Sequence, residues 1–160
     1  MDDRPTEYDP HMSSDHSAVY EARYAWTPFQ ILSGTWKGRL VAFRVDERGV
    51  TLGGAPAKYE RHKAFVPWPE IESVALWSHK VVGAAPMRYV GVRRKPGTPV
   101  LPGPNAGLSR EQTTKLAPHV SHELFLASRC VTMWTLDPHR LAEAVSAFAP
   151  GVPVETVPDA

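Results

Sequence analysis

The most regular pattern of hydrophobic and polar positions lies near the end of the chain. Residues 131–136 set β-branched side chains around Trp134, a composition typical of a strand on a half-buried surface. Beyond them, Asp137 and Pro138 suit the cap and the first position of a helix. Apolar residues then recur at helical spacing, at Leu141, Ala144, Val145 and Phe148. The pattern predicts a strand over 131–136, then an amphipathic helix over 138–149 whose apolar side needs a sheet to cover it.

Apolar and polar positions predict six further strands before this strand and helix. They lie at residues 36–45, 50–52, 61–68, 69–77, 87–94 and 123–128. Residues 46–49, Asp-Glu-Arg-Gly, are typical of a hairpin turn, and Pro69 indicates a sharp corner between two strands. Because the strands precede one helix with no βαβ alternation, the pattern predicts a mainly-β α+β fold. Seven antiparallel strands would form a bent sheet or barrel that the C-terminal helix plugs.

The remaining segments divide the chain around one main domain, predicted over residues 36–150. Residues 1–17 are polar and acidic, which predicts a disordered leader. Residues 18–35 are predicted to be an extended arm or an extra strand that pairs with a sheet edge. The Pro- and Gly-rich loop over 96–119 is expected to be disordered or draped over the domain, with a short helix at 108–116. Residues 151–160 are predicted to be a tail, and the candidate partner-facing residues of the arm are Tyr20, Tyr24 and Trp26.

Length and composition narrow the class of protein. With 160 residues and 42% hydrophobic content, the chain can form one core of ordinary size. No apolar run reaches the ~18 residues of a membrane helix, and the first residues lack the features of a secretory signal, so we expect a soluble, cytoplasmic protein. Cys130 is the single cysteine. This excludes an intrachain disulfide and a cysteine metal cluster.

The formal net charge of +1 conceals an uneven distribution of charge. Residues 1–21 and 137–160 are acidic, whereas the middle of the chain is strongly basic. A basic body between acidic ends can attract anionic partners, and a scattered, solvated exterior is the alternative interpretation. A nucleic-acid partner is not favoured, because the arginines beside Tyr89 fit a half-exposed strand. The candidate contacts for an anionic ligand are Lys37, Arg39, Arg88, Arg93, Arg94 and Lys95.

Few residues form a pattern that carries chemistry. His119, His122 and Glu123 are residue types that bind zinc, but an extended path there would turn positions three apart to opposite faces. Ser128 and Cys130 are nucleophile types without a local catalytic motif. We therefore predict no catalytic residue, no cofactor and no metal ion.

Several of these positions together resemble the bacterial pleckstrin-homology-like (PH-like) domains. The similarity is carried by residues 49–53 (Gly-Val-Thr-Leu-Gly), 65–71 with Val74, 89–92, and 134–137 leading into the last helix, and it spans about residues 36–150. The resemblance implies a strongly bent, seven-stranded antiparallel barrel capped at one open end by the last helix. It also implies a non-enzymatic role, docking on membrane headgroups, on proteins or on like subunits.

One turn departs from the pattern of this family. Members that bind phosphoinositides resemble one another in a basic loop between the first two strands, whereas residues 46–49 here include two carboxylates. Like charge would repel an anionic headgroup. No lipid-binding residue is therefore carried over from the family.

Three functions follow as hypotheses. The first is a non-catalytic PH-like interaction module that docks on a protein partner or on itself, through sheet edges or the loop 96–119. The second is a binder of an anionic membrane surface or anionic ligand, through the basic middle of the chain. The third is a small enzyme with its site under the loop 96–119, which requires a deep pocket there that holds titratable groups.

Overall fold

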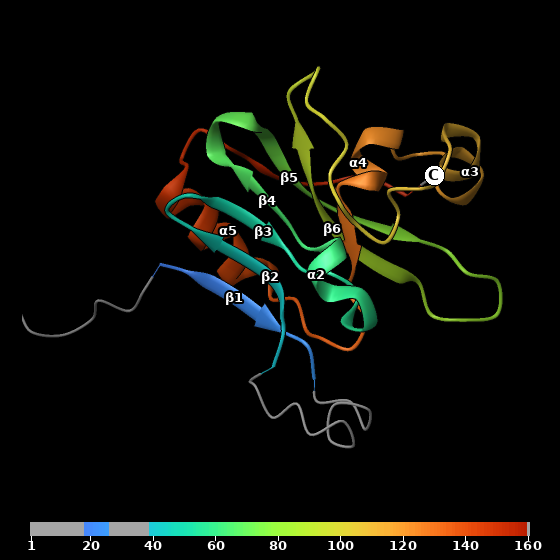
Figure 1. Ribbon diagram of the computed structural model, residues 1–160, viewed down its shortest axis with the longest axis horizontal. Coiled ribbons are helices and arrows are strands. Elements are labelled where there is room, and N and C mark those ends of the chain that lie inside the picture. Colours follow the sequence, from blue (N-terminus) through green and yellow to red (C-terminus); the bar gives the residue numbers. More distant parts are fainter. Residues whose placement is uncertain (1–17, 26–38, 160) are drawn as a thin grey trace, which may run out of the picture.

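The computed structural model describes residues 18–25 and 39–159, which form two four-stranded sheets with helices on either side (Figure 1). The strands are β1 (Tyr20–Arg23), β2 (Val41–Asp46), β3 (Gly49–Leu52), β4 (Ala64–Pro67), β5 (Ile71–His79), β6 (Met87–Arg94), β7 (Ser128–Cys130) and β8 (Val154–Thr156). The helices are α2 (Tyr59–His62), α3 (Arg110–Leu116), α4 (His122–Leu126) and α5 (Pro138–Phe148), with two 3-10 turns, η1 (Pro56–Lys58) and η2 (Trp68–Glu70). The predicted leader over 1–17 lies outside the described residues, and so do Trp26 and Lys37.

The first sheet has the strand order β1-β2-β3-β4, and its three strand pairs are antiparallel. β1 lies in the segment predicted as an arm or extra strand, and it pairs with β2 of its own chain. β2 and β3 form the hairpin expected at residues 46–49. Gly49 is required in this hairpin because a side chain there would collide with the backbone of Val66 on β4.

One carboxylate of the acidic turn of this hairpin, Asp46, is neutralised within the fold. The Asp46 carboxylate is 2% exposed and accepts hydrogen bonds from the Arg48 N–H and from the Arg44 guanidinium, both at 3.0 Å. Burial alone would raise the pKa of Asp46, but these two donors lower it below its usual value. One of the two carboxylates that distinguish this turn from a basic loop is thus a structural group.

The second sheet has the order β7-β6-β5-β8. β5 and β6 form a long antiparallel hairpin, and the loop between them projects from the body of the molecule (Figure 1). The turn η2 separates β4 from β5 at the predicted corner. β8 pairs in parallel with β5 in a segment predicted to be a tail. The described chain therefore confirms a mainly-β α+β fold with mostly antiparallel sheets, and it contains eight strands where seven were predicted.

The predicted closed barrel is wrong, because among the described residues no ladder joins the two sheets, either between β4 and β5 or after β7. This strand ends at Cys130, and Met133 adopts a positive φ of 63°, which turns the chain out of the direction of the sheet. On this side a hydrogen bond from the Ala25 N–H to the Met133 carbonyl, 2.7 Å, joins the end of the β1 segment to the segment after β7. No ladder between β1 and β7 is present in the described residues, so the two sheets stay separate.

Two of the predicted strands are also wrong. Residues 123–128 fall mostly in α4, whose residues Leu124, Phe125 and Leu126 are all buried because the helix packs on β6 and α3. A short apolar run does not distinguish a buried strand from such a helix. Residues 131–136 do alternate, with Trp134 and Leu136 buried, but in the described chain no strand pairs with them.

The main core lies between the two sheets and under α5. Asp137 starts this helix by accepting hydrogen bonds from the N–H groups of His139 and Arg140, both 3.1 Å. The apolar side of α5 then packs against β1 and β2. A second, smaller core lies on the other face of the second sheet, where Trp77 meets α4. The helix contributes Leu141, Ala144 and Val145 to the main core, over the predicted range.

Arg129 on β7 is a buried cation, 2% exposed, that bonds four backbone carbonyls. Its guanidinium donates to the carbonyls of Gly53 (2.5 Å), His62 (2.8 Å), Pro102 (2.8 Å) and its neighbour Ser128 (3.0 Å). Burial lowers the pKa of Arg129 to about 10, so the group stays protonated at neutral pH. Its bonds join β7, the connection between β3 and β4, and the loop 96–119.

We expect Arg129→Ala to lower the free energy of unfolding by about 3 kcal/mol or more, because it leaves buried carbonyls without donors and opens a cavity. Urea denaturation of the full chain measures this change. Arg140→Ala, at an exposed position on α5, is the matched control and should change stability by less than about 0.5 kcal/mol. Equal effects of the two substitutions would show that Arg129 does not hold the fold together.

Candidate functional site

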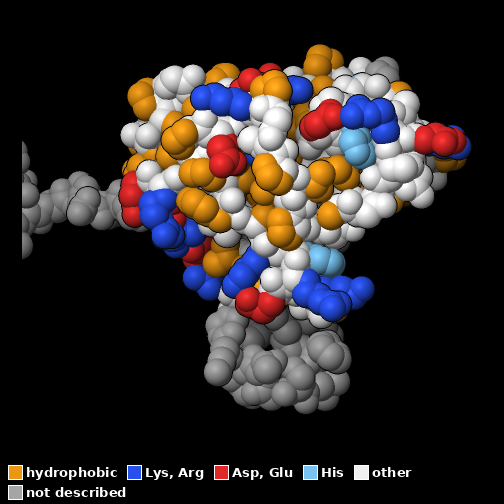
Figure 2. All heavy atoms as spheres, turned by 45° about the horizontal axis from the view of Figure 1, so that its top comes forward, with side chains coloured by type: hydrophobic (Ala, Val, Ile, Leu, Met, Phe, Trp, Pro, Cys, Tyr) orange, Lys and Arg blue, Asp and Glu red, His pale blue; other side chains and the backbone are white. Residues whose placement is uncertain are grey.

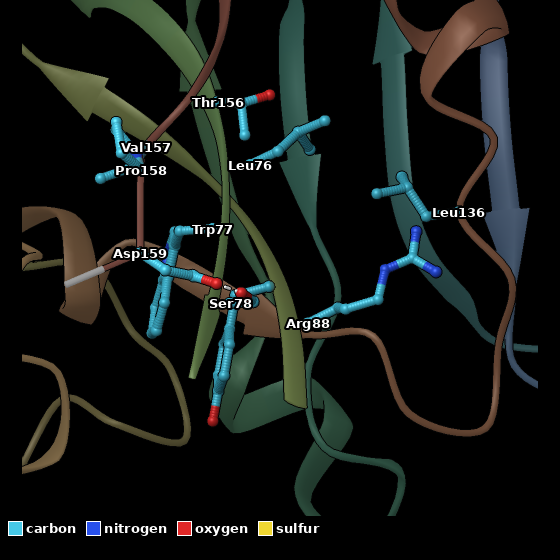
Figure 3. A pocket seen from close by; sticks show the side chains of 10 residues that line it. Leu76, Trp77, Ser78, Arg88, Leu136, Thr156, Val157, Pro158 and Asp159 are labelled. Carbon is cyan, nitrogen blue, oxygen red and sulfur yellow. Dashed lines mark hydrogen bonds between the residues drawn. The ribbon is translucent and has the colours of Figure 1, made fainter. Parts of the chain in front are cut away.

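A groove of about 300 Å³ lies at one end of the second sheet (Figure 3). Leu76 on β5 and Leu136, in the segment before α5, give it an apolar lining, and Arg88 reaches from β6 towards Leu136. The segment after β8 forms the opposite wall with Val157 and Pro158. The groove is thus assembled from four segments that are distant in sequence.

The aromatic pair beside the groove is held rigidly. The rings of Trp77 and Tyr89 stack with their centroids 4.0 Å apart and their planes 3° from parallel. The Trp77 indole N–H donates to the Ser128 hydroxyl (2.9 Å), which in turn donates to the Leu124 carbonyl (2.7 Å). This chain of bonds fixes the second sheet against α4. The floor of the groove is therefore preformed.

The polar rim of the groove is asymmetric. The Ser78 hydroxyl donates to the Asp159 carboxylate (2.6 Å), which ties the last described residue to β5 (Figure 3). Arg88, the cross-strand partner of Ser78, is exposed, and no carboxylate among the described residues forms a salt bridge with it. The groove therefore offers one cation beside an apolar surface.

A second concave site, which we call the loop pocket, lies between the end of β6, the loop 96–119 and α4. It has a volume of about 340 Å³. Figure 2 shows basic, acidic and histidine side chains gathered on the right of that view, where α4 lies. The titratable residues that line the loop pocket are Arg94, Lys95, Arg110, His122 and Glu123.

The six candidate contacts for an anion do not form one site. Arg94 and Lys95 line the loop pocket, and Arg88 lines the groove. Arg93 is bonded instead to Glu155 of β8, 3.0 Å away. Arg39 is exposed far along the chain, and Lys37 lies outside the described residues. The candidate anion contacts taken from the sequence did not include Arg110 of α3 and His122 of α4, which line the loop pocket together with Arg94 and Lys95.

The aromatic residues expected to face a partner belong to the core of this chain. Tyr20 is 4% exposed and Tyr24 is 7% exposed, and both pack in the main core. The Tyr20 hydroxyl also accepts a hydrogen bond from the Asp137 N–H (3.0 Å), at the start of α5. The alternation in the arm therefore reflects its pairing within the first sheet, and these two side chains are not available to a partner. Trp26 lies outside the described residues.

The two histidines considered for a metal site have separate partners. His119 Nε2 lies 2.9 Å from the Ser78 carbonyl, and His122 Nδ1 lies 2.9 Å from the Thr113 hydroxyl. His122 begins α4 instead of the extended path expected there. Within residues 18–25 and 39–159, no group of three or more His, Cys, Asp or Glu is placed to hold a metal ion. Ser128 is buried and structural, and Cys130 lies 2.9 Å from the Thr132 hydroxyl.

Comparisons with protein-family models, with curated proteins and with solved structures found no match to this chain. The PH-like assignment therefore stays a prediction. Among the described helices, none is long and apolar enough to cross a membrane. The site must consequently be interpreted from its own geometry.

Tyr89, which lines the groove, makes the stability of the fold depend on pH. Burial, with smaller contributions from Cys130, raises the pKa of its phenol to about 12. Because the unfolded value is about 10, the linked stabilisation is complete below about pH 10 and is lost as the pH rises to about 12. We expect wild type to lose stability relative to Tyr89→Phe over this range, measured by urea denaturation from about pH 9 upwards. A constant difference between the two proteins would contradict the buried, protonated phenol.

Proposed function

We propose that this chain is a non-catalytic, PH-like interaction module that binds an extended segment of a protein partner in the groove beside Arg88. The observation that supports it is the combination of an apolar, preformed floor with a cation, Arg88, that forms no salt bridge among the described residues, while the Asp159 carboxylate of the same groove is bonded to Ser78. The segment it fits carries an apolar side chain close to a carboxylate.

The energetic argument rests on these two features of the groove. Burying apolar surface against Leu76 and Leu136 stabilises a complex by about 25 cal/mol per Å². A carboxylate placed beside Arg88 adds a charge-assisted hydrogen bond and gives specificity and a faster association rate. The volume of about 300 Å³ is at the small end of binding pockets, so it takes one or two side chains. We therefore expect a modest affinity.

The neighbouring edge of the second sheet supports an extended ligand. β8 is the last strand of this sheet, and no described strand pairs with its outer edge. The carbonyl of Pro153 and the N–H of Val157 bond to β5, so by alternation the backbone groups of Val154 and Thr156 point away from it. Such an edge can accept a further strand through main-chain hydrogen bonds.

The order of the elements supports the PH-like part of the proposal. Within residues 36–150, which carry the resemblance, the six mostly antiparallel strands β2 to β7 precede α5, which packs on the first sheet; this fits the strands-then-helix order of the resemblance, with β1 as an added strand. β8 and the open sheet depart from it. The non-catalytic part is supported by the Ser78 hydroxyl, which bonds to Asp159 and not to a histidine that could activate it. A cytoplasmic location and the enzyme hypothesis for the loop pocket stay predictions.

A peptide-display selection on the full chain tests the proposal. We expect enriched sequences in which an acidic residue stands next to a large apolar residue. Arg88→Glu should weaken the selected peptides about tenfold or more, because it replaces attraction by repulsion. Lys58→Glu, an equal charge reversal at an exposed position outside the groove, should leave their affinity within about twofold.

The selection can also overturn the proposal. Failure to enrich any motif, or equal loss of affinity in the Arg88 and Lys58 variants, would rule out the groove as the binding site. The hypothesis also allows the chain to dock on a second copy of itself, and sedimentation of the chain alone tests this form. A dimer that Arg88→Glu dissociates would identify a second copy, and not a different protein, as the occupant.

A further inference from the structure

The loop pocket carries more positive than negative charge. Arg94, Lys95 and Arg110 are cations, and Glu123 is the one carboxylate in the described lining. The ion pair between Arg110 and Glu123 (2.6 Å) links α3 to α4. Because both side chains are exposed, this pair contributes little to the stability of the fold. A net positive charge in a concave site concentrates anions.

The ring of His122 is oriented by the fold. The Thr113 hydroxyl is buried and donates its hydrogen to the Arg110 carbonyl (3.1 Å). In the contact between this hydroxyl and His122 Nδ1 (2.9 Å), this hydrogen-bond network assigns the donor role to Nδ1. Nε2 is left as the free ring nitrogen on a residue that lines the pocket. A protonated phosphate oxygen can donate to this nitrogen, and a protonated imidazole can donate to a phosphate.

Arg94 is a partly buried cation whose hydrogen bonding is incomplete. One nitrogen of its guanidinium donates to the Pro99 carbonyl at 2.6 Å, which shapes the loop around the pocket. Burial lowers its pKa, and the charge of Glu70, whose carbonyl accepts from the neighbouring Lys95 N–H (2.9 Å), offsets this only in part. A guanidinium that has lost water and has no carboxylate in contact gains from an anion that accepts from its remaining N–H groups.

We propose that the loop pocket binds a phosphate group, held by Arg94, Lys95, Arg110 and His122. Phosphate suits the site because it accepts several hydrogen bonds at once and its charge balances the unpaired cations. The volume of about 340 Å³ leaves room for a small organic part attached to the phosphate. This site is separate from the groove, so the inference does not rest on the proposed function.

An NMR titration of the full chain with inorganic phosphate, at constant ionic strength, tests the proposal. We expect saturable shifts confined to the amide signals of residues 94, 95, 97 and 98, of 110–113 and of 122–123. Lys95→Gln, which removes an exposed cation with little structural cost, should weaken binding several-fold. Glu123→Gln should instead strengthen it about threefold, because a competing carboxylate is removed. A gain in affinity cannot result from a variant that fails to fold.

Arg93→Gln is the matched control. Arg93 is next to Arg94 on the same strand but bonds to Glu155 on β8, so its loss should leave phosphate affinity within about twofold. Shifts that do not saturate and spread over exposed cations such as Lys58 would overturn the proposal. So would an affinity that Glu123→Gln and Lys95→Gln leave unchanged.

Two sources of the phosphate are separated by a second measurement. Vesicles of phosphatidylcholine with phosphatidic acid are sedimented with the chain and with its Lys95→Gln variant. Binding that this variant loses would assign the pocket to a lipid headgroup. Saturable phosphate binding without vesicle binding would assign it to a soluble phosphorylated molecule.

Discussion

A buried guanidinium joins the parts of this molecule that are far apart in sequence. Arg129 donates to carbonyls at positions 53, 62 and 102, which lie in the connection between β3 and β4 and in the loop 96–119. A carboxylate partner would have produced a simple ion pair. Carbonyls instead allow one side chain to satisfy several irregular segments, whose backbone groups have no ladder to bond to. The fold depends on this cation because these segments carry few other regular hydrogen bonds.

The position of Arg129 also explains why the two concave sites are well formed. The neighbouring Ser128 accepts a hydrogen bond from Trp77, which stacks on Tyr89 beside the groove. The bond from Arg129 to the Pro102 carbonyl anchors the loop 96–119 beside the loop pocket. Gly103 follows Pro102, and a side chain there would press on the guanidinium. Two neighbouring residues of β7, Ser128 and Arg129, therefore position both sites. Loss of this strand would affect the two together.

The sequence predicts the features of the fold that are local. The hairpin at 46–49, the strand over 87–94 and the capped helix after Asp137 each depend on residues that are close in the chain. Closure of the sheet depends on whether distant edge strands pair, and the positive φ of Met133 after one of these edges is not revealed by a β-favouring composition. The candidate sites combine residues that are far apart in the chain, such as Arg94, Arg110 of α3 and His122 of α4, which line one pocket. No short motif encodes such a combination.

The basic middle of the chain is not a single electrostatic surface. On the first sheet Arg44 is bonded to Glu21 (2.6 Å) and to Asp46 (3.0 Å), and on the second sheet Arg93 is bonded to Glu155. These cations contribute little to long-range attraction, because their fields are cancelled nearby and screened by salt. The cations that matter for binding are those that the fold leaves without a carboxylate in a concave place. Among the described residues, Arg88 in the groove and Arg94 and Lys95 in the loop pocket form no salt bridge, and both proposals rest on the pairing of single charges and not on the net charge.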